Sequence, residues 1–332
     1  MSGADPSSLL VFPSSIKMFL KALRFFFPWV LILCLGIAWG LSFSLAKIAV
    51  NNGADPLTLT VWQSFLAGIM LMVLMLLGRA RLPFEKGLLG LCLVIAVCGF
   101  IIPGVSFYYA APHVQAGVLS ITVTLVPILT YAISIPLGLE KPEIKRIIGL
   151  VLGSLAILLI VIPENSLPET KAIPWILLSC LGSAFYALEG IVIATKMPEK
   201  LNPIGVACIG NFLAVFFLWP MLYGSGQQMT LNWPLDISGL AIFGISFISA
   251  VAYTLYIFVI KLYGPLFASQ SAYVVTLAGV FWGMAIFEEE HSLWVWSSLL
   301  SMLVGLILVT PRKKNSGYST KTEFGIDGGN PP

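Results

Sequence analysis

The sequence predicts an all-α membrane protein whose ten transmembrane helices form two inverted five-helix repeats. Composition, ten long apolar runs and a similarity between the two halves of the chain all point to this fold class. Of the 332 residues, 58% are hydrophobic and only 10% are charged, whereas soluble domains carry about 25% charged residues. The mean hydropathy of +0.96 excludes an ordinary soluble globule, and it also excludes a disordered chain, which needs low hydrophobicity and high charge.

Ten runs are long and apolar enough to cross a membrane, because a helix spanning about 30 Å of hydrocarbon needs about 20 mostly apolar residues. Turn-forming stretches such as 51–56 and 224–226 separate the runs. The first run is too long for the apolar core of a cleaved signal peptide. We expect spans over 28–50, 57–78, 87–109, 114–138, 146–162, 172–195, 204–223, 236–260, 265–287 and 293–310.

Lysine and arginine are distributed unevenly between the two faces of this arrangement. With the N-terminus on the cytoplasmic side, sixteen of the 18 basic residues face the cytoplasm, and only Lys47 and Lys171 lie outside. Basic residues accumulate in cytoplasmic loops, so we expect both termini to be cytoplasmic. Residues 1–27 would form a cytoplasmic arm with an interfacial stretch over 16–27, and residues 311–332 a disordered tail.

The two halves of the chain share similar positions at nearly one offset, which predicts repeats over 28–162 and 172–310. Because each repeat holds an odd number of spans, the second enters the membrane from the opposite side. Many secondary transporters have this architecture and bind substrate where the repeats meet. The matching positions are Gly36-x-x-Trp39 with Gly182-x-x-Phe185 (offset 146), Leu139-Glu140 with Phe287-Glu288-Glu289 (148 to 149) and Pro163 with Pro311 (148).

Short motifs also follow one another in a fixed order along the chain. They are Gly36-x-x-Trp39-Gly40-x-x-Phe43, Ala116, Pro127, Tyr131, Leu139-Glu140 and Gly149 in the first half, and Gly264-Pro265-x-x-Ala268, Glu289 and Gly305 in the second. In this order they resemble the ten-span, EamA-type members of the drug/metabolite transporter superfamily, over about residues 28 to 311. The resemblance implies a carrier of small metabolites, often working outward. Two positions depart from it, because Gln63 stands where the family often has arginine and Thr276 where it has a proline within span 9.

One carboxyl group lies inside a predicted span. Glu189 falls in the cytoplasmic half of span 172–195, and ionisable groups at such a position are costly and mark functional sites. It could bind a substrate amine or couple transport to a proton. The alternative is a structural carboxyl group satisfied by a neighbouring hydroxyl or amide.

Aromatic side chains near the middle of the spans are the other candidates for substrate contact. Tyr253 and Tyr256 share one helix face because they are three residues apart, and tyrosines at this depth need hydrogen-bond partners, which a wet cavity would supply. Aromatic faces suit amphipathic or cationic solutes, although packing or contact with lipid remains an alternative for each. The predicted contact residues are Trp39, Phe43, Tyr109, Tyr186, Glu189, Tyr253, Tyr256, Gln270 and Tyr273.

The polar residues at the outer ends of the spans have simpler interpretations. We expect Lys47 to extend its long side chain to water, and His113 to be a solvated cap. Residues 288–291 could be read as metal ligands, but adjacent residues do not preset a coordination shell, so we expect a solvated loop and no metal. Five cysteines lie in apolar runs without a C-x-x-C pair, which indicates neither a disulfide framework nor a zinc site.

The sequence lacks a P-loop and the common hydrolase motifs, and its net charge of +3 gives no indication of nucleic-acid binding. We therefore expect a secondary transporter without a cofactor, which exports small metabolites across the bacterial inner membrane by alternating access. The alternatives are a lipid flippase, a membrane-embedded lipid-modifying enzyme and a non-transporting sensor. A homodimer stays open, because G-x-x-x-G motifs occur no more often than chance predicts.

Overall fold

The computed structural model describes residues 14–78, 87–162, 170–198, 201–226, 235–263 and 271–309. These residues form helices and no β-strand. In chain order the helices are α1 (Ser14–Asn51), α2 (Pro56–Leu77), α3 (Leu88–Ile95), the π-helix η2 (Ala96–Ile101), α4 (Ile102–Ala110), α5 (Ala116–Val123), α6 (Leu125–Ser134), α7 (Ile144–Val161), the 3-10 turn η3 (Thr170–Ala172), α8 (Ile173–Lys196), α9 (Pro203–Gly224), α10 (Ile237–Tyr263), α12 (Ser271–Phe287) and α13 (Leu293–Val309).

Each of the ten predicted spans corresponds to a helical stretch in this structure. Eight stretches have the length and composition to cross a membrane, and two shorter apolar helices, α12 and α13, complete the set. The predicted beginning of span 9, residues 265–270, lies outside the described residues. At the other end of the chain, α1 begins at Ser14 and continues through Pro28. The expected interfacial stretch 16–27 is therefore one helix with the first span.

Prolines interrupt the third and fourth spans. Pro103 has no N–H to donate to the carbonyl group of Gly99, and the helix widens there into the π-helix η2. Pro127 likewise cannot donate to Val123, where α5 ends before α6 begins. Thr276 replaces the proline that the resemblance expects in span 9, and α12 is unbroken. The first repeat therefore contains two interrupted spans.

Helices α2 and α9 occupy equivalent places in the two halves and begin in the same way. The Asp55 carboxylate accepts a hydrogen bond from the Thr58 N–H at 3.0 Å, and the Asn202 side chain accepts one from the Ile204 N–H at 3.0 Å. A proline follows each cap in the first helical position, where its missing N–H and fixed φ suit a helix start.

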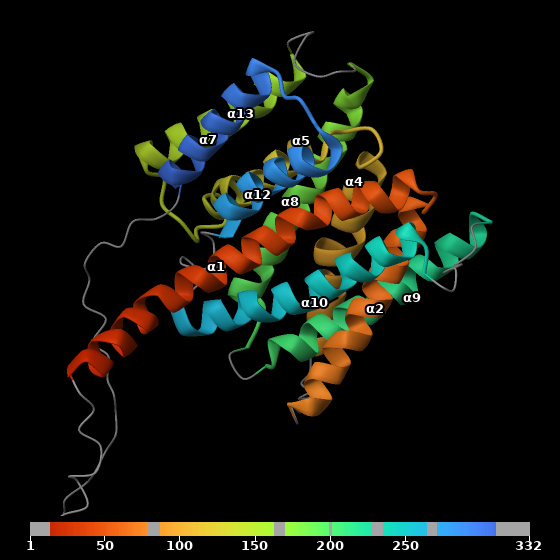
Figure 1. Cartoon of the computed structure of the whole chain (residues 1–332), viewed down its shortest axis with the longest axis horizontal. Coiled ribbons are helices and arrows are strands. Elements are labelled where there is room, and N and C mark those ends of the chain that lie inside the picture. The colour runs from red at the N-terminus through yellow and green to blue at the C-terminus, as the bar shows by residue number, and fades with distance from the viewer. Residues whose placement is uncertain are drawn as a thin grey trace, which may run out of the picture.

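The packing of the helices also repeats between the halves. Helix α1 packs against α12 and α10, and its counterpart α8 packs against α6 and α4 in the same way. The pairs α2 with α9 and α7 with α13 each join one helix to its own counterpart. Figure 1 shows α7 and α13 side by side at the top, and α1 running between α12 and α10. This reciprocal pattern is what two inverted copies of one five-helix unit produce.

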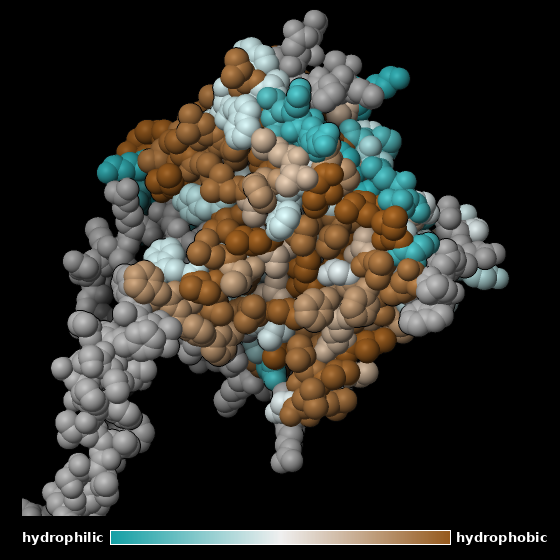
Figure 2. Space-filling model, viewed as in Figure 1, coloured by the Kyte–Doolittle hydropathy of each residue, from teal (hydrophilic) through white to brown (hydrophobic). Residues whose placement is uncertain are grey.

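The outer surface of the bundle is strongly apolar. Figure 2 shows hydrophobic residues over most of the drawn face, with hydrophilic ones gathered mainly toward the end of the bundle where α1 ends. Large apolar side chains such as Phe216, Leu300 and Phe247 are exposed on the helices. Such a surface suits contact with hydrocarbon rather than water, as expected for a multi-pass membrane protein.

Candidate functional site

The carboxyl group of Glu189 is buried where the two repeats meet. Only 7% of the residue is exposed, and its Oε1 atom has no hydrogen-bond partner among the described residues. The carboxylate lies directly against Gly99 of η2, where a β-carbon would clash with it. Pro103 thus produces a wide turn in the first repeat, and the glycine in that turn leaves room for an acidic group from the second.

Three tyrosines surround Glu189 closely enough to interact with it electrostatically. Tyr186 lies one turn earlier on α8, and Tyr253 and Tyr256 come from α10. The Trp39 ring of α1 lies 5.5 Å from the Tyr256 ring, centroid to centroid. All four aromatic residues keep part of their surface accessible. The structure therefore brings four of the predicted contact residues together around the predicted carboxyl group.

Two phenylalanines that the sequence analysis did not single out extend this aromatic set. The ring of Phe107 lies 5.6 Å from Phe43 and is stacked at 6.1 Å on Tyr186, while the ring of Phe100 lies 6.2 Å from Tyr253. Both belong to the interrupted third span. Apolar rings are common in every span, so only the tertiary packing distinguishes these two.

The remaining predicted contact residues have different positions. Tyr109 packs with Leu57 and Leu218, in a cluster separate from the aromatic set around Glu189, and its contact with substrate stays a prediction. Tyr273 is partly exposed on α12. Gln270 lies outside the described residues.

A chain of neutral polar groups occupies the position where the resemblance expects arginine. The Tyr108 hydroxyl donates to the Gln63 Oε1 at 2.9 Å, and the Gln63 Nε2 donates to the Ser249 hydroxyl at 2.8 Å. These bonds connect α4, α2 and α10. Both ends of the Gln63 amide are satisfied without any charge, so this position offers no cation for an anionic solute.

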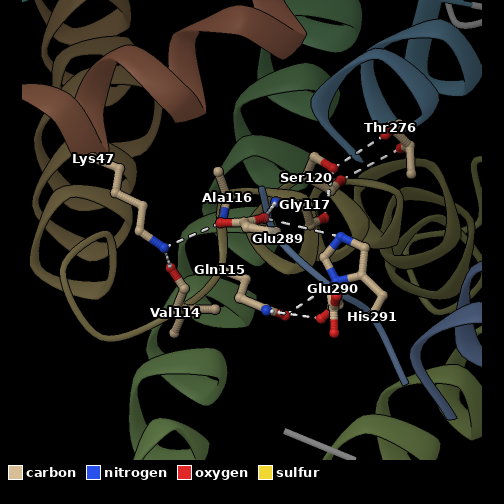
Figure 3. A network of polar contacts seen from close by, with 10 residues as sticks. All are labelled: Lys47, Val114, Gln115, Ala116, Gly117, Ser120, Thr276, Glu289, Glu290 and His291. Carbon is tan, nitrogen blue, oxygen red and sulfur yellow. Dashed lines mark hydrogen bonds and ion pairs between the residues drawn. The ribbon is translucent and has the colours of Figure 1, made fainter. Parts of the chain in front are cut away.

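A second polar cluster lies where α1 ends (Figure 3). The Glu289 Oε1 accepts from the Lys47 Nζ at 3.1 Å and from the Ala116 N–H at 2.7 Å. Its Oε2 accepts from the Gly117 N–H at 3.1 Å. The Lys47 ammonium also donates to the Val114 carbonyl group at 3.1 Å. Only 8% of Glu289 is exposed, and the cluster joins α1, the start of α5 and the end of α12.

Two sequence-based expectations are wrong at this cluster. Glu289 is buried rather than part of a solvated loop, and Lys47 is paired with it rather than extended to water. The loop sequence is polar, and that pattern normally indicates solvation. Here the free N–H groups at the start of α5 and a lysine 242 residues away satisfy the carboxylate, and no local pattern reveals such partners.

His291 follows Glu289 in the same loop and is also enclosed. Its Nδ1 lies 3.1 Å from the Gln115 Oε1, and the Gln115 Nε2 donates to the Glu290 carbonyl group at 3.1 Å. Burial lowers the pKa of His291, the nearby Lys47 ammonium lowers it further, and Glu289 opposes both effects. The imidazole is therefore neutral at physiological pH.

His113 is exposed, as expected for a solvated cap, and it stacks on Trp175 with ring centroids 4.1 Å apart. In the part of the chain that the structure describes, no group of three or more histidine, cysteine, aspartate or glutamate side chains could hold a metal ion. The five cysteines, which all lie within this part, are free.

Comparison with known proteins connects this architecture to a family. The family described as "EamA-like transporter family" matches residues 27–162 and again residues 173–310. The chain belongs to this family. The two consecutive matches agree with the repeated packing of the helices, so each EamA-like unit supplies one half of the bundle and one part of the surroundings of Glu189.

Relatives of this EamA-like chain are described as transporters. One from Escherichia coli strain K12, named "Uncharacterized inner membrane transporter YedA", is 25% identical over 282 residues, which cover 82% of this chain and 87% of the relative. An "Uncharacterized transporter" from Archaeoglobus fulgidus is 22% identical over 201 residues, covering 60% of this chain and 69% of the relative.

A solved structure, titled "Crystal structure of protein", shares the fold. The two structures align with a TM-score of 0.58 at 15% sequence identity, over 84% of this chain and 96% of the other. The family and the relatives thus identify this protein as a member of a transporter family with many membrane spans.

Proposed function

We propose that this EamA-like protein is a secondary transporter that exports small amphipathic or cationic solutes, such as amines or amino acids, across the cytoplasmic membrane by alternating access. The observation that carries the proposal is the buried Glu189 carboxylate, with one oxygen atom unpartnered among the described residues. It is surrounded by aromatic residues from both repeats. The names of the relatives support transport, and the excess of basic residues on one face supports the cytoplasmic position of both termini.

The chemistry around Glu189 favours a cationic group. A carboxylate that lacks a partner in a low-dielectric surrounding is costly, and either a bound ammonium group or a proton would relieve that cost. The faces of Trp39, Tyr253 and Tyr256 attract cations as well. If the ammonium group and the proton compete for this one carboxylate, solute export is coupled to proton entry.

The position between the repeats suits alternating access. Residues from α1 and η2 of the first repeat and from α8 and α10 of the second meet at Glu189. Movement of one repeat relative to the other would change the exposure of this group to the two sides. Binding at such an interface is usual for transporters built from inverted repeats.

The proposal is tested by reconstituting the full chain in liposomes loaded with a mixture of amino acids, amines and nucleosides. Solute loss is measured by mass spectrometry with and without a proton gradient. We expect selective loss of amine-bearing solutes, strengthened by a gradient that drives protons inward. Glu189→Gln should abolish the dependence on the gradient, and Gly99→Ala should weaken transport because it displaces the carboxylate without removing it.

Glu143→Gln is the matched control, since Glu143 is exposed at an end of the bundle and should leave transport unchanged. Gradient-dependent loss in Glu189→Gln equal to that of the unmodified chain would disprove the coupling role. If no solute leaves the liposomes but labelled phospholipid moves between the leaflets, the result would favour a lipid flippase instead.

A further inference from the structure

Two lysine and glutamate pairs occur at one spacing in the chain. Lys47 and Lys196 are 149 residues apart, and so are Glu140 and Glu289. Lys47 lies in the last turns of α1, and Lys196 is the last residue of its counterpart α8. Glu289 follows the end of α12, and Glu140 follows the end of α6. The two glutamates are thus equivalent at the spacing of Leu139-Glu140 and its counterpart, whereas Lys196 lies about one helical turn beyond the position that the spacing of 146 between Gly36 and Gly182 pairs with Lys47.

The two pairs lie at opposite ends of the bundle. The direction of the chain reverses at each of the ten spans, so the end of α1, the start of α5 and the end of α12 share one end, while the end of α6 and the end of α8 share the other. The packing corresponds too, because α12 packs against α1 as α6 packs against α8. Glu140 is therefore placed to meet Lys196 as Glu289 meets Lys47.

Only one of the two pairs is formed in this structure. Lys47 and Glu289 are 3.1 Å apart, with side chains that are 15% and 4% exposed, and backbone N–H groups of α5 complete the site. Lys196 is exposed and forms no ion pair with Glu140, although both residues lie within the described part of the chain. Glu140 instead pairs with Arg146 at 2.8 Å, and its side chain is 43% exposed.

We propose that Lys47–Glu289 and Lys196–Glu140 are two alternating locks, each closing one end of the transport pathway while the other is open. The structure then represents the state that is closed at the Lys47 end. In the opposite state the Lys47 pair separates, and Glu140 moves from Arg146 to Lys196, closing the other end. This inference rests on the proposed alternating access and adds the residues that hold each state.

Local contacts at the open end are compatible with such an exchange. Glu140 is 43% exposed, so water can solvate its carboxylate when it leaves Arg146, whose own side chain is only 6% exposed. Arg146 keeps a second contact without Glu140, because its guanidinium lies 4.7 Å from the centre of the Tyr131 ring. It therefore holds the acidic group close to the end of α6 until Lys196 approaches.

The experiment measures the two locks directly and needs no substrate. In a full chain whose five native cysteines are replaced by serine, Glu140→Cys is combined with Lys196→Cys, and disulfide formation on oxidation is followed in native membranes. Glu289→Gln is then added to weaken the lock at the other end. We expect cross-linking to rise by about fivefold or more, the lower range of typical coupling between two sites. Lys47→Met should have the same effect.

Glu143→Cys combined with Lys196→Cys is the matched control, since Glu143 is close to Glu140 in sequence, is exposed and has no counterpart at the repeat spacing. Its cross-linking should not respond to Glu289→Gln. A response equal to that of the Glu140 pair would indicate general loosening and would overturn the proposal. So would an absent or unchanged Glu140–Lys196 cross-link in chains that insert normally.

The result is independent of the liposome experiment. If cross-linking shifts as expected but the chain moves no solute, the alternating locks are supported and the proposed solutes are contradicted. If solute is transported but cross-linking does not shift, the proposed transport is supported and the alternating locks are contradicted.

Discussion

At the scale of single residues, the Glu289 carboxylate shows how a buried anion is stabilised in this fold. Two backbone N–H groups at the start of α5 and one ammonium group donate to it. Negative charge at a helix N-terminus is favourable in addition, because the helix dipole is positive there. Loss of the Lys47 charge alone would leave a buried acid with fewer donors, which would disfavour this closed arrangement relative to one in which water reaches Glu289.

We predict that His291 makes the stability of this end of the bundle dependent on pH. Burial and Lys47 lower the pKa of His291 in the folded protein, and Glu289 only partly offsets them. The third polar neighbour, Gln115, is uncharged. As the pH falls below the ordinary histidine value of about 6.5, the unfolded chain binds the proton first. The stability that the neutral imidazole contributes is therefore complete above that pH and is lost as the pH falls toward the folded-state pKa.

The measurement is the Tm of the detergent-purified chain at pH 7.5 and pH 5.5, compared with that of His291→Gln. The Tm of the unmodified chain should fall further on acidification than that of the variant. The corresponding difference in the free energy of unfolding is at most about 1.4 kcal/mol per unit of pKa shift. Equal losses in both proteins would show that other groups account for the pH dependence.

At the scale of helices, glycines determine how closely α1, α5 and α12 approach. A β-carbon at Gly40 would lie 2.8 Å from the Ala278 β-carbon and 2.9 Å from the Val275 carbonyl oxygen, both in α12. A β-carbon at Gly279 would clash with Ser120 of α5. The G-x-x-x-G pairs of α1 and α12 thus serve packing within the chain, and they give no separate indication of a homodimer.

We predict that Gly40→Ala destabilises the bundle by about 1 to 3 kcal/mol, the usual result of overpacking, because backbone atoms of α12 cannot move aside as a flexible side chain can. Gly90→Ala is the control, since Gly90 of α3 is exposed and a β-carbon there meets nothing within 4 Å. It should be neutral or stabilising by up to about 1 kcal/mol. Thermal unfolding of both variants in detergent provides the comparison, and equal Tm values would contradict the packing argument.

At the scale of the whole molecule, the helices were predictable from sequence and the tertiary contacts were not. Runs of apolar residues identify each span because the hydrocarbon thickness sets their length. Glu189 was predictable for a related reason, since an acidic residue within a span is conspicuous. The π-helix beside Glu189 depends on two residues together. Pro103 cannot donate to the carbonyl group of Gly99, and Gly99 faces α8 without a side chain. Burial of Glu289 depends on partners far away in sequence, so the surrounding loop indicated the opposite.

The last prediction concerns the orientation of the molecule in the membrane. The positive-inside rule and the distribution of sixteen basic residues against two indicate that Lys47 and Glu289 lie at the external end and Lys196 and Glu140 at the cytoplasmic end. This orientation decides which of the two states is captured here. If the Lys47 end is closed as proposed, the proposed site around Glu189 would open toward the cytoplasm, the side from which an exporter loads its solute.

Single cysteines placed at the two ends of the bundle test this orientation in a chain otherwise free of cysteine. Asn52→Cys lies in the exposed turn after α1, and Lys141→Cys in the exposed loop before α7. A membrane-impermeant maleimide applied to intact cells should label Asn52→Cys, and should label Lys141→Cys only after the membrane is permeabilised. The reverse pattern would place the closed lock on the cytoplasmic side, so the captured state would be open to the outside and ready to release solute. Labelling of both variants in intact cells would mean that the chain inserts in two orientations, and the basic residues would then not determine the direction of transport.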